Sequence, residues 1–309
     1  MDEVRTSSVM QEMAYRYNQL YLTPEKGVSG TGVYSDIVRY GKLPPEIDEK
    51  IKNEGLSGFK CSEKDRLFSE NTPAGMVDIL FLQERSDFER FVQVMVYSCE
   101  PAAVASKIES AEILGVTNWR KIENHMNDYL SNGGSNLSWR DELRKFTNNK
   151  KNYQDTILVI GSGGYCGLTA EEDGFEKDTW EEISVKIKIY SSCARYIVRK
   201  LFSDYKDIIW EEMLADCAGL LYATGRYDVS LAKKFFGVSG KGYDRRGKLI
   251  NFKGDSEFEI NELAVRVSSA TDKLGNYVNR MLAEDNTDYY RILFRLMEEM
   301  NTFVSIIKG

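Results

Sequence analysis

The apolar residues of this chain recur mostly at helical spacing. In the clearest stretch, from Trp180 to Phe202, six apolar side chains follow one another at intervals of four, three, four, three and four positions. This spacing places them on one face of an α-helix. The six residues are Ile183, Ile187, Tyr190, Ala194, Ile197 and Leu201. A second apolar run, 208–225, predicts another helix soon after the first.

The rest of the chain predicts further helices and two strands. Helices are expected at 1–20, at 45–55 after Pro44, at 86–99, after the capping residue Asn118, at 139–150, and from 257 to the end with a break near 283–288. The β-branched run 156–161 is the strongest strand candidate, and 76–84 is the second. The pattern therefore predicts a mainly α protein with a small β-sheet, of the α+β class. We expect two regions, a mostly helical one over 1–150 and a second one over 151–309. The alternative is a single continuous domain.

Composition and charge exclude several classes of partner. Hydrophobic residues make up 42% and charged residues 29% of the chain, which is ordinary for a folded globular protein. A net charge of −7 leaves no general basic surface for nucleic acid. No run approaches the ~20 apolar residues that span a bilayer, so we expect neither a nucleic-acid nor a membrane partner. Five scattered cysteines, an odd number, favour reduced thiols in the cytoplasm.

The chain contains one histidine, His125, and this count limits the chemistry. A metal site with several histidines is impossible within one chain. A Cys–His or Ser–His nucleophilic pair would have to use His125. We expect this residue at the surface or half-buried on its helix.

Two short segments have the composition of a ligand-binding loop, but a tight turn and a solvated loop explain them better. A strand entering Gly161, Gly163 and Gly164 suggests a dinucleotide loop, but the third glycine of G-x-G-x-x-G falls on Cys166. An acidic stretch follows instead of a helix start, so the pattern predicts a tight turn after an edge strand. The basic run 241–248 suits an anion, but a solvated loop explains it more simply.

The two central helices carry a resemblance to a known kind of protein. Residues 210–216 read WEEMLAD and residues 223–228 read ATGRYD, and both segments, together with 110–122, resemble an uncharacterised bacterial family. That family resembles zincin-like metallohydrolases, which carry HExxH on one helix and an acidic ligand on the next. The resemblance implies a zincin-like helix pair preceded by a strand, with zinc held by two histidines and an acid, and with the Glu of HExxH activating water.

This chain lacks the metal-binding and catalytic residues of the HExxH pattern. The five residues in place of HExxH are Tyr190, Ser191, Ser192, Cys193 and Ala194. Alanine cannot bind a metal, and serine cannot act as a base of suitable pKa. The downstream acids Glu212 and Asp216 remain, one helical turn apart. The donor set therefore excludes a zinc centre of the usual kind, and no cofactor is expected.

If the zincin-like helix pair is kept without a metal ion, we expect a pocket between the two helices. Its candidate lining residues are Tyr190, Ser191, Cys193, Glu212 and Asp216. A metal site built from Cys166, Cys193 and Cys217 is a lesser alternative, because no C-x-x-C spacing supports it.

Three functions remain open at this point. The chain is a catalytically degenerate protein that binds or regulates, with an unknown protein or small molecule as its ligand. Alternatively, it is a metal-free enzyme that uses Tyr190, Cys193, Glu212 and Asp216 for acid–base chemistry. The third possibility is a structural, partner-binding protein in which the helix pair is only core. In a structural role, Asp216 would be buried and would accept hydrogen bonds from Tyr190, Ser191 or Ser192.

Overall fold

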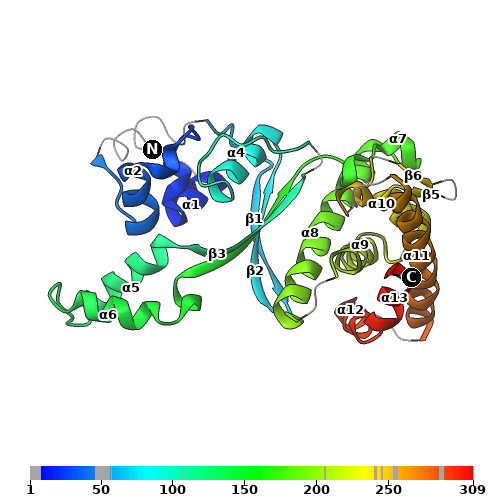
Figure 1. Ribbon diagram of the computed structural model, residues 1–309. Helices are drawn as coiled ribbons and strands as arrows, with labels where there is room; N and C mark the ends of the chain where they lie inside the picture. Colours follow the sequence, from blue (N-terminus) through cyan, green and yellow to red (C-terminus); the bar gives the residue numbers. More distant parts are fainter. Residues whose placement is uncertain are drawn as a thin grey trace, which may run out of the picture. The chain divides into compact units, whose positions relative to one another are not determined.

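The computed structural model describes residues 8–45, 56, 58–106, 108–204, 207–239, 242–244, 246–252, 257–284 and 289–308. Helices predominate and a small four-stranded sheet accompanies them, which confirms the predicted α+β class (Figure 1). The chain divides into two compact units. Unit 1 comprises residues 1–70 and 77–161, and unit 2 comprises residues 71–76 and 162–309. Unit 1 ends at Gly161, the last residue of a strand that pairs within the sheet.

The sheet has the strand order β1-β2-β4-β3. Its strands are β1 (Arg66–Thr72), β2 (Gly75–Leu82), β3 (Ser110–Thr117) and β4 (Gln154–Gly161). β4 runs parallel to β2 and antiparallel to β3. The strands predicted at 76–84 and 156–161 are thus confirmed as β2 and β4. The prediction that the second of them is an edge strand is wrong, because β4 has a neighbour on each side.

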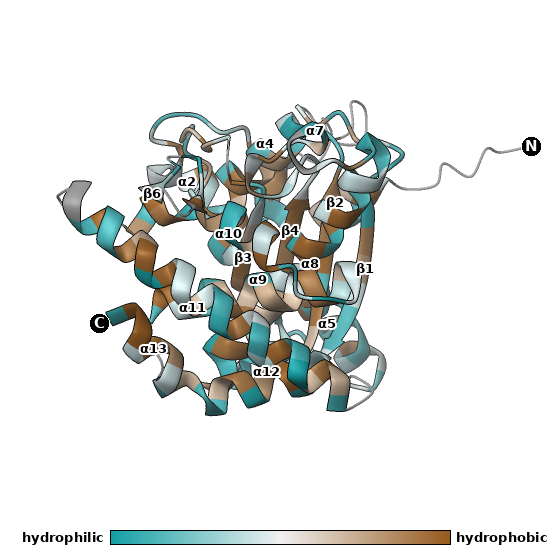
Figure 2. Cartoon of the chain, turned by 90° about the vertical axis from the view of Figure 1, so that its right-hand side faces the viewer, coloured by the Kyte–Doolittle hydropathy of each residue, from teal (hydrophilic) through white to brown (hydrophobic). Residues whose placement is uncertain are grey.

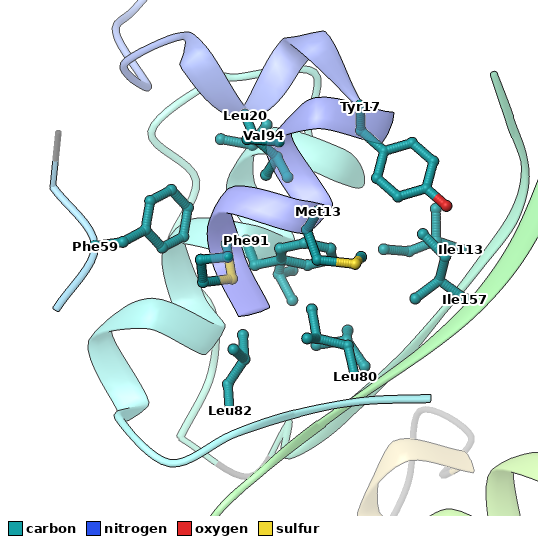
Figure 3. Packing of buried hydrophobic residues seen from close by; sticks show 14 of the residues in the cluster. Met13, Tyr17, Leu20, Phe59, Leu80, Leu82, Phe91, Val94, Ile113 and Ile157 are labelled. Carbon is teal, nitrogen blue, oxygen red and sulfur yellow. The ribbon is translucent and has the colours of Figure 1, made fainter. Parts of the chain in front are cut away.

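The helices of unit 1 include α1 (Val9–Arg16), α2 (Gly32–Tyr34), α4 (Arg85–Met95), α5 (Trp119–Ser131) and α6 (Trp139–Thr147). Of these, α1 and α4 pack on one face of the sheet. Alternate residues of β2 and β4, among them Leu80, Leu82 and Ile157, pack against α1 and α4 (Figure 3). Met13 and Phe91 contribute the helical side of this cluster. The helix predicted at 45–55 lies outside the described residues.

A buried carboxylate holds α1 and α5 at the start of β4. Asp155 accepts hydrogen bonds from the Tyr17 hydroxyl at 2.6 Å, the Asn118 side-chain amide at 2.6 Å and the Lys121 ammonium at 2.5 Å. Burial would raise the pKa of Asp155, but these donors outweigh it and lower the pKa. The Asn118 side chain also accepts from the Lys121 backbone N–H, which confirms the predicted cap of α5.

Unit 2 is built mainly from helices, of which α8, α9 and α11 are the longest. They are α7 (Ala170–Asp173), α8 (Lys177–Leu201), α9 (Ile208–Thr224), α10 (Val229–Phe236), α11 (Glu257–Glu284), α12 (Tyr289–Glu298) and α13 (Met300–Lys308). Two short strands, β5 (Val238–Ser239) and β6 (Gly242–Tyr243), form a separate hairpin. α8 and α9 confirm the two helices predicted from the apolar periodicity. In Figure 2, α11 and α12 alternate between brown and teal residues along their length, as amphipathic helices do.

The second central helix, α9, is the most enclosed. Asp207 caps its start by accepting from the Trp210 N–H, and Gly225 ends it with a left-handed φ of 73°. Every residue from Met213 to Leu221 is buried, and α8, α10, α12 and α13 all contact the helix. Within the described part of the chain, no helix combines the length and apolarity needed to cross a membrane.

Candidate functional site

A polar stripe runs along α8 beside its apolar face. Ser184, Lys188, Ser191 and Arg195 follow one another at intervals of four, three and four residues, so they share one side of the helix. The first three are at most 1% exposed, and the Arg195 side chain is 12% exposed. Buried polar groups must be hydrogen-bonded. This stripe therefore indicates where α8 meets other polar groups of unit 2.

The first partner of the stripe is the loop that follows β4. The Lys188 ammonium donates to the backbone carbonyl of Ser162 at 3.2 Å and to that of Gly163 at 2.8 Å. The Tyr165 N–H donates to the Ser184 hydroxyl at 3.1 Å. A β-carbon on Gly164 would lie 1.9 Å from the Leu168 carbonyl oxygen, so only glycine fits there. A tight turn clamped by α8 accounts for these glycines.

The second partner is an acidic pair on α9, which binds a lysine from a distant segment. Glu212 and Asp216 lie one turn apart, and both face Lys248 at the start of η6 (Lys248–Phe252). The Lys248 ammonium lies 2.5 Å from Asp216 Oδ1 and 2.9 Å from Glu212 Oε2. It also donates to the hydroxyl of Tyr165 at 2.8 Å. All three ammonium hydrogens thus have a partner.

Further contacts complete what we call the ion cluster, comprising Tyr165, Arg195, Glu212, Asp216 and Lys248. The Tyr165 hydroxyl donates to Asp216 Oδ1 at 2.6 Å, and Arg195 Nε donates to Glu212 Oε1 at 3.0 Å. The Asp216 side chain is 1% exposed, against 15% for Glu212 and 14% for Lys248. Its second oxygen, Oδ2, is buried and has no hydrogen-bond partner in the part of the chain that the structure describes. Asp216 is therefore the member that depends most on Lys248.

A close crossing of two glycines brings Lys248 to this position. A β-carbon on Gly247 would lie 2.1 Å from the backbone nitrogen of Gly237, and one on Gly237 would lie 2.4 Å from the Asp244 carbonyl oxygen. Gly237 ends α10 with a left-handed φ of 69°. The chain thus closes on itself between Gly237 and Gly247, and the next residue is Lys248.

The electrostatics of the ion cluster follow from burial and charge pairing. Burial would raise the pKa of Glu212, but Lys248 and Arg195 outweigh it and hold that pKa at about 2. Burial raises the pKa of Asp216 above its ordinary value, against the opposing effect of Lys248. For Lys248, burial acts to lower the pKa, and the two carboxylates more than reverse this. The ion cluster thus pairs two basic side chains, Arg195 and Lys248, with two acidic ones, Glu212 and Asp216.

We expect Glu212 to account for part of the acid sensitivity of the fold. Its pKa falls from an ordinary 4.5 to about 2 in the folded chain. The ionised carboxylate therefore contributes fully to the free energy of unfolding above pH 4.5, and this contribution is lost as the pH falls toward 2. Glu212→Gln should be less stable than wild type at neutral pH and should lose less stability over that interval. Urea unfolding at a series of pH values measures this. Parallel curves for the two proteins would contradict the assignment.

The predicted site residues are only partly brought together. Glu212 and Asp216 share Lys248, and the Tyr165 hydroxyl lies 3.4 Å from the Ser191 hydroxyl and 2.6 Å from Asp216 Oδ1. The hydroxyl donor to Asp216 is Tyr165 rather than one of the three predicted on α8. The Tyr190 ring stacks on Tyr222, with centroids 3.8 Å apart, and Cys193 is fully buried in α8.

The residues present do not fit a resident metal ion. Both acids of α9 bind Lys248, and the histidines of the zincin pattern are missing. Among the described residues, no group of three or more His, Cys, Asp or Glu is placed to hold a metal. The thiols of Cys166, Cys193 and Cys217, the alternative metal ligands, do not form such a group. No cysteine takes part in a disulfide.

Sequence reasoning missed four residues of this site: Tyr165, Lys188, Arg195 and Lys248. The polar stripe could have been found, because Lys188 and Arg195 lie at helical spacing from Ser184 and Ser191. No regular spacing in the sequence links Lys248 to the other residues of the site. The solvated loop predicted for 241–248 is wrong for this residue, since its ammonium is enclosed by the ion cluster.

Comparison with known proteins gives a family and no function. No curated protein and no solved structure matches the chain. One family model matches residues 1–304, which is nearly the whole chain, and its description is "Family of unknown function (DUF7005)". The chain therefore belongs to this DUF7005 family.

Proposed function

We propose that this protein is catalytically degenerate and acts as a binding or regulatory protein. The observation that carries the proposal is Lys248, which engages both remaining acids of the zincin-like helix pair. In this proposal, Lys248 supplies the positive charge that a metal ion supplies in zincin-like enzymes. Tyr190 and Ala194, in place of two metal-binding histidines, are consistent with it.

The same contacts argue against acid–base catalysis at these residues. A general base must come within hydrogen-bonding reach of a substrate proton. Asp216 is 1% exposed and already bonded to Lys248 and Tyr165, while Glu212 is held between Lys248 and Arg195. A metal-free enzyme that uses Glu212 or Asp216 would first have to break these ion pairs, so this alternative has less support.

Close helix packing supports a purely structural role for the pair α8 and α9. Gly219 of α9 lies so close to Ser191 and Ile187 of α8 that no β-carbon would fit between them. In the proposal, the helix pair and the ion cluster hold unit 2 together, and the ligand, a protein or a small molecule, binds at another surface. We further propose a cytoplasmic location, which the absence of disulfides supports.

Elemental analysis of the purified protein tests the proposal. We expect no stoichiometric zinc or iron in wild type, and the same result in Asp216→Ala and Cys193→Ser. Cys61→Ser, which changes a half-buried thiol of unit 1, serves as the control. One metal ion per chain in wild type and in Cys61→Ser, lost in the other two variants, would replace the proposal with a rebuilt metal site.

A further inference from the structure

The helices α5 and α6 form a hairpin in unit 1 (Figure 1). Its apolar face is only partly covered, because neither helix has a fully buried residue. Their aromatic side chains pack mainly on one another. The rings of His125 and Phe146 stack at 4.0 Å, and Trp139 lies 5.9 Å from His125 and 6.0 Å from Tyr129. The hairpin therefore has a small, half-exposed core of its own.

The tip of the hairpin is uncharged and carries one fully exposed leucine. From Tyr129 to Trp139 the chain contains no Asp, Glu, Lys or Arg. Leu137 is 98% exposed, more than any other large hydrophobic residue among those described. The tip is also held in shape. The Tyr129 ring lies against Gly134, leaving no room for a β-carbon, and its hydroxyl lies 2.6 Å from the Ser138 hydroxyl.

Basic residues border this tip. The segment 119–151 contains seven Lys or Arg and four Asp or Glu, a net charge of +3 in a chain whose total is −7. On α6, Arg144 is 69% and Lys145 is 76% exposed, and Arg140 is also exposed. Lys150 and Lys151 follow in η4 (Lys150–Asn152), and both are exposed. An apolar tip with a basic border is complementary to an anionic lipid surface.

We propose that the α5–α6 hairpin docks on anionic lipid bilayers, with Leu137 inserted among the head groups and the basic residues of 140–151 on lipid phosphates. Tyr129 and Trp139 then lie at the level where aromatic side chains favour the membrane interface. Such docking needs no membrane-spanning helix. It goes beyond the proposed function and does not depend on the ion cluster. Nucleic acid suits the hairpin less well, because its rings stack on one another and are not displayed as a platform for bases.

Vesicle flotation with the full chain tests this inference. We expect wild type to float with vesicles of phosphatidylcholine and phosphatidylglycerol in equal parts, and not with phosphatidylcholine alone. Leu137→Glu removes the inserted side chain and should weaken binding about tenfold or more. The double variant Arg144→Glu and Lys145→Glu should weaken it to a similar degree, and added salt should do the same. Val265→Glu, at a 67% exposed position of α11, is the matched control and should bind like wild type.

Three outcomes would overturn the inference. Wild type that does not float with anionic vesicles at low salt contradicts it directly. Equal binding by wild type and Leu137→Glu would remove the role of the tip. Light scattering that finds a dimer in wild type and a monomer in Leu137→Glu, without vesicle binding by either, would assign the tip to a second copy of the chain. Circular dichroism of each variant tests whether a loss of vesicle binding is caused by a loss of folding.

Discussion

Replacing Lys248 by methionine should destabilise the fold by about 3–5 kcal/mol at neutral pH, because it leaves buried carboxylates without their cation. Asp216 is affected most. It is 1% exposed, and its Oδ2 has no hydrogen-bond partner among the described residues. Without Lys248, the Tyr165 hydroxyl would be the side-chain donor that remains to it. Glu212 keeps Arg195 and should tolerate the change better. Methionine preserves most of the side-chain volume, so the loss reports the charge.

Urea unfolding of wild type and Lys248→Met measures this effect. Lys233→Met is the matched control, because Lys233 pairs with Asp272 in the same unit but Asp272 is 54% exposed. An exposed pair of that kind contributes about 0–1 kcal/mol. The loss in Lys248→Met should also shrink as the pH falls, since a protonated Asp216 no longer needs a cation. Equal stabilities of the two variants would show that the ion cluster is not the critical contact.

The second large effect is expected at the crossing of α8 and α9. In an ordinary helix, Gly→Ala stabilises by about 0.5–1 kcal/mol. At Gly219, a β-carbon would lie 2.4 Å from the Ser191 hydroxyl and 2.8 Å from the Ile187 carbonyl oxygen. The two helices would have to move apart, and overpacking of this kind costs about 1–3 kcal/mol or more. Gly219→Ala should therefore be destabilising, against its helix propensity.

Thermal unfolding of Gly219→Ala, Ser191→Ala and the double variant tests this explanation. Ser191→Ala removes the closest contacting atom, so the double variant should lose less than the sum of the two single variants. The carbonyl of Ile187 remains, and recovery should be partial. Gly219→Ala at or above wild-type stability would mean that the helices are not this close in solution.

Much of the helical part of the fold could be predicted from the sequence, because long amphipathic helices repeat their pattern several times. α8 and α9 follow from apolar spacing, and α5 follows from the cap at Asn118. The strands β1 and β3 were missed. β1 is an edge strand with mostly exposed positions, and β3 is only partly buried, so neither shows a clear apolar alternation.

The candidate site was harder to predict, for two physical reasons. The HExxH frame puts Tyr190 and Ala194 at the metal-binding positions of α8, whereas the side of α8 that meets α9 at the acids is one position further on. Ser191 there bonds the Ala215 carbonyl, and Arg195 bonds Glu212. A shift of one residue turns a helical side chain by about 100°. The other reason is Lys248, which reaches the acids only because two glycines ten residues apart cross at close range. Local sequence contains no signal for such a crossing.

A double-mutant cycle on Lys248 and Asp216 tests the central claim most directly, namely that the chain neutralises its buried acid with its own lysine. The four proteins are wild type, Lys248→Met, Asp216→Asn and the double variant, and the quantity measured is the free energy of unfolding in urea at neutral pH. We predict a coupling on the order of 3 kcal/mol, with the double variant more stable than Lys248→Met alone. Losses that simply add would contradict the claim, because Lys248 and Asp216 would then not depend on each other.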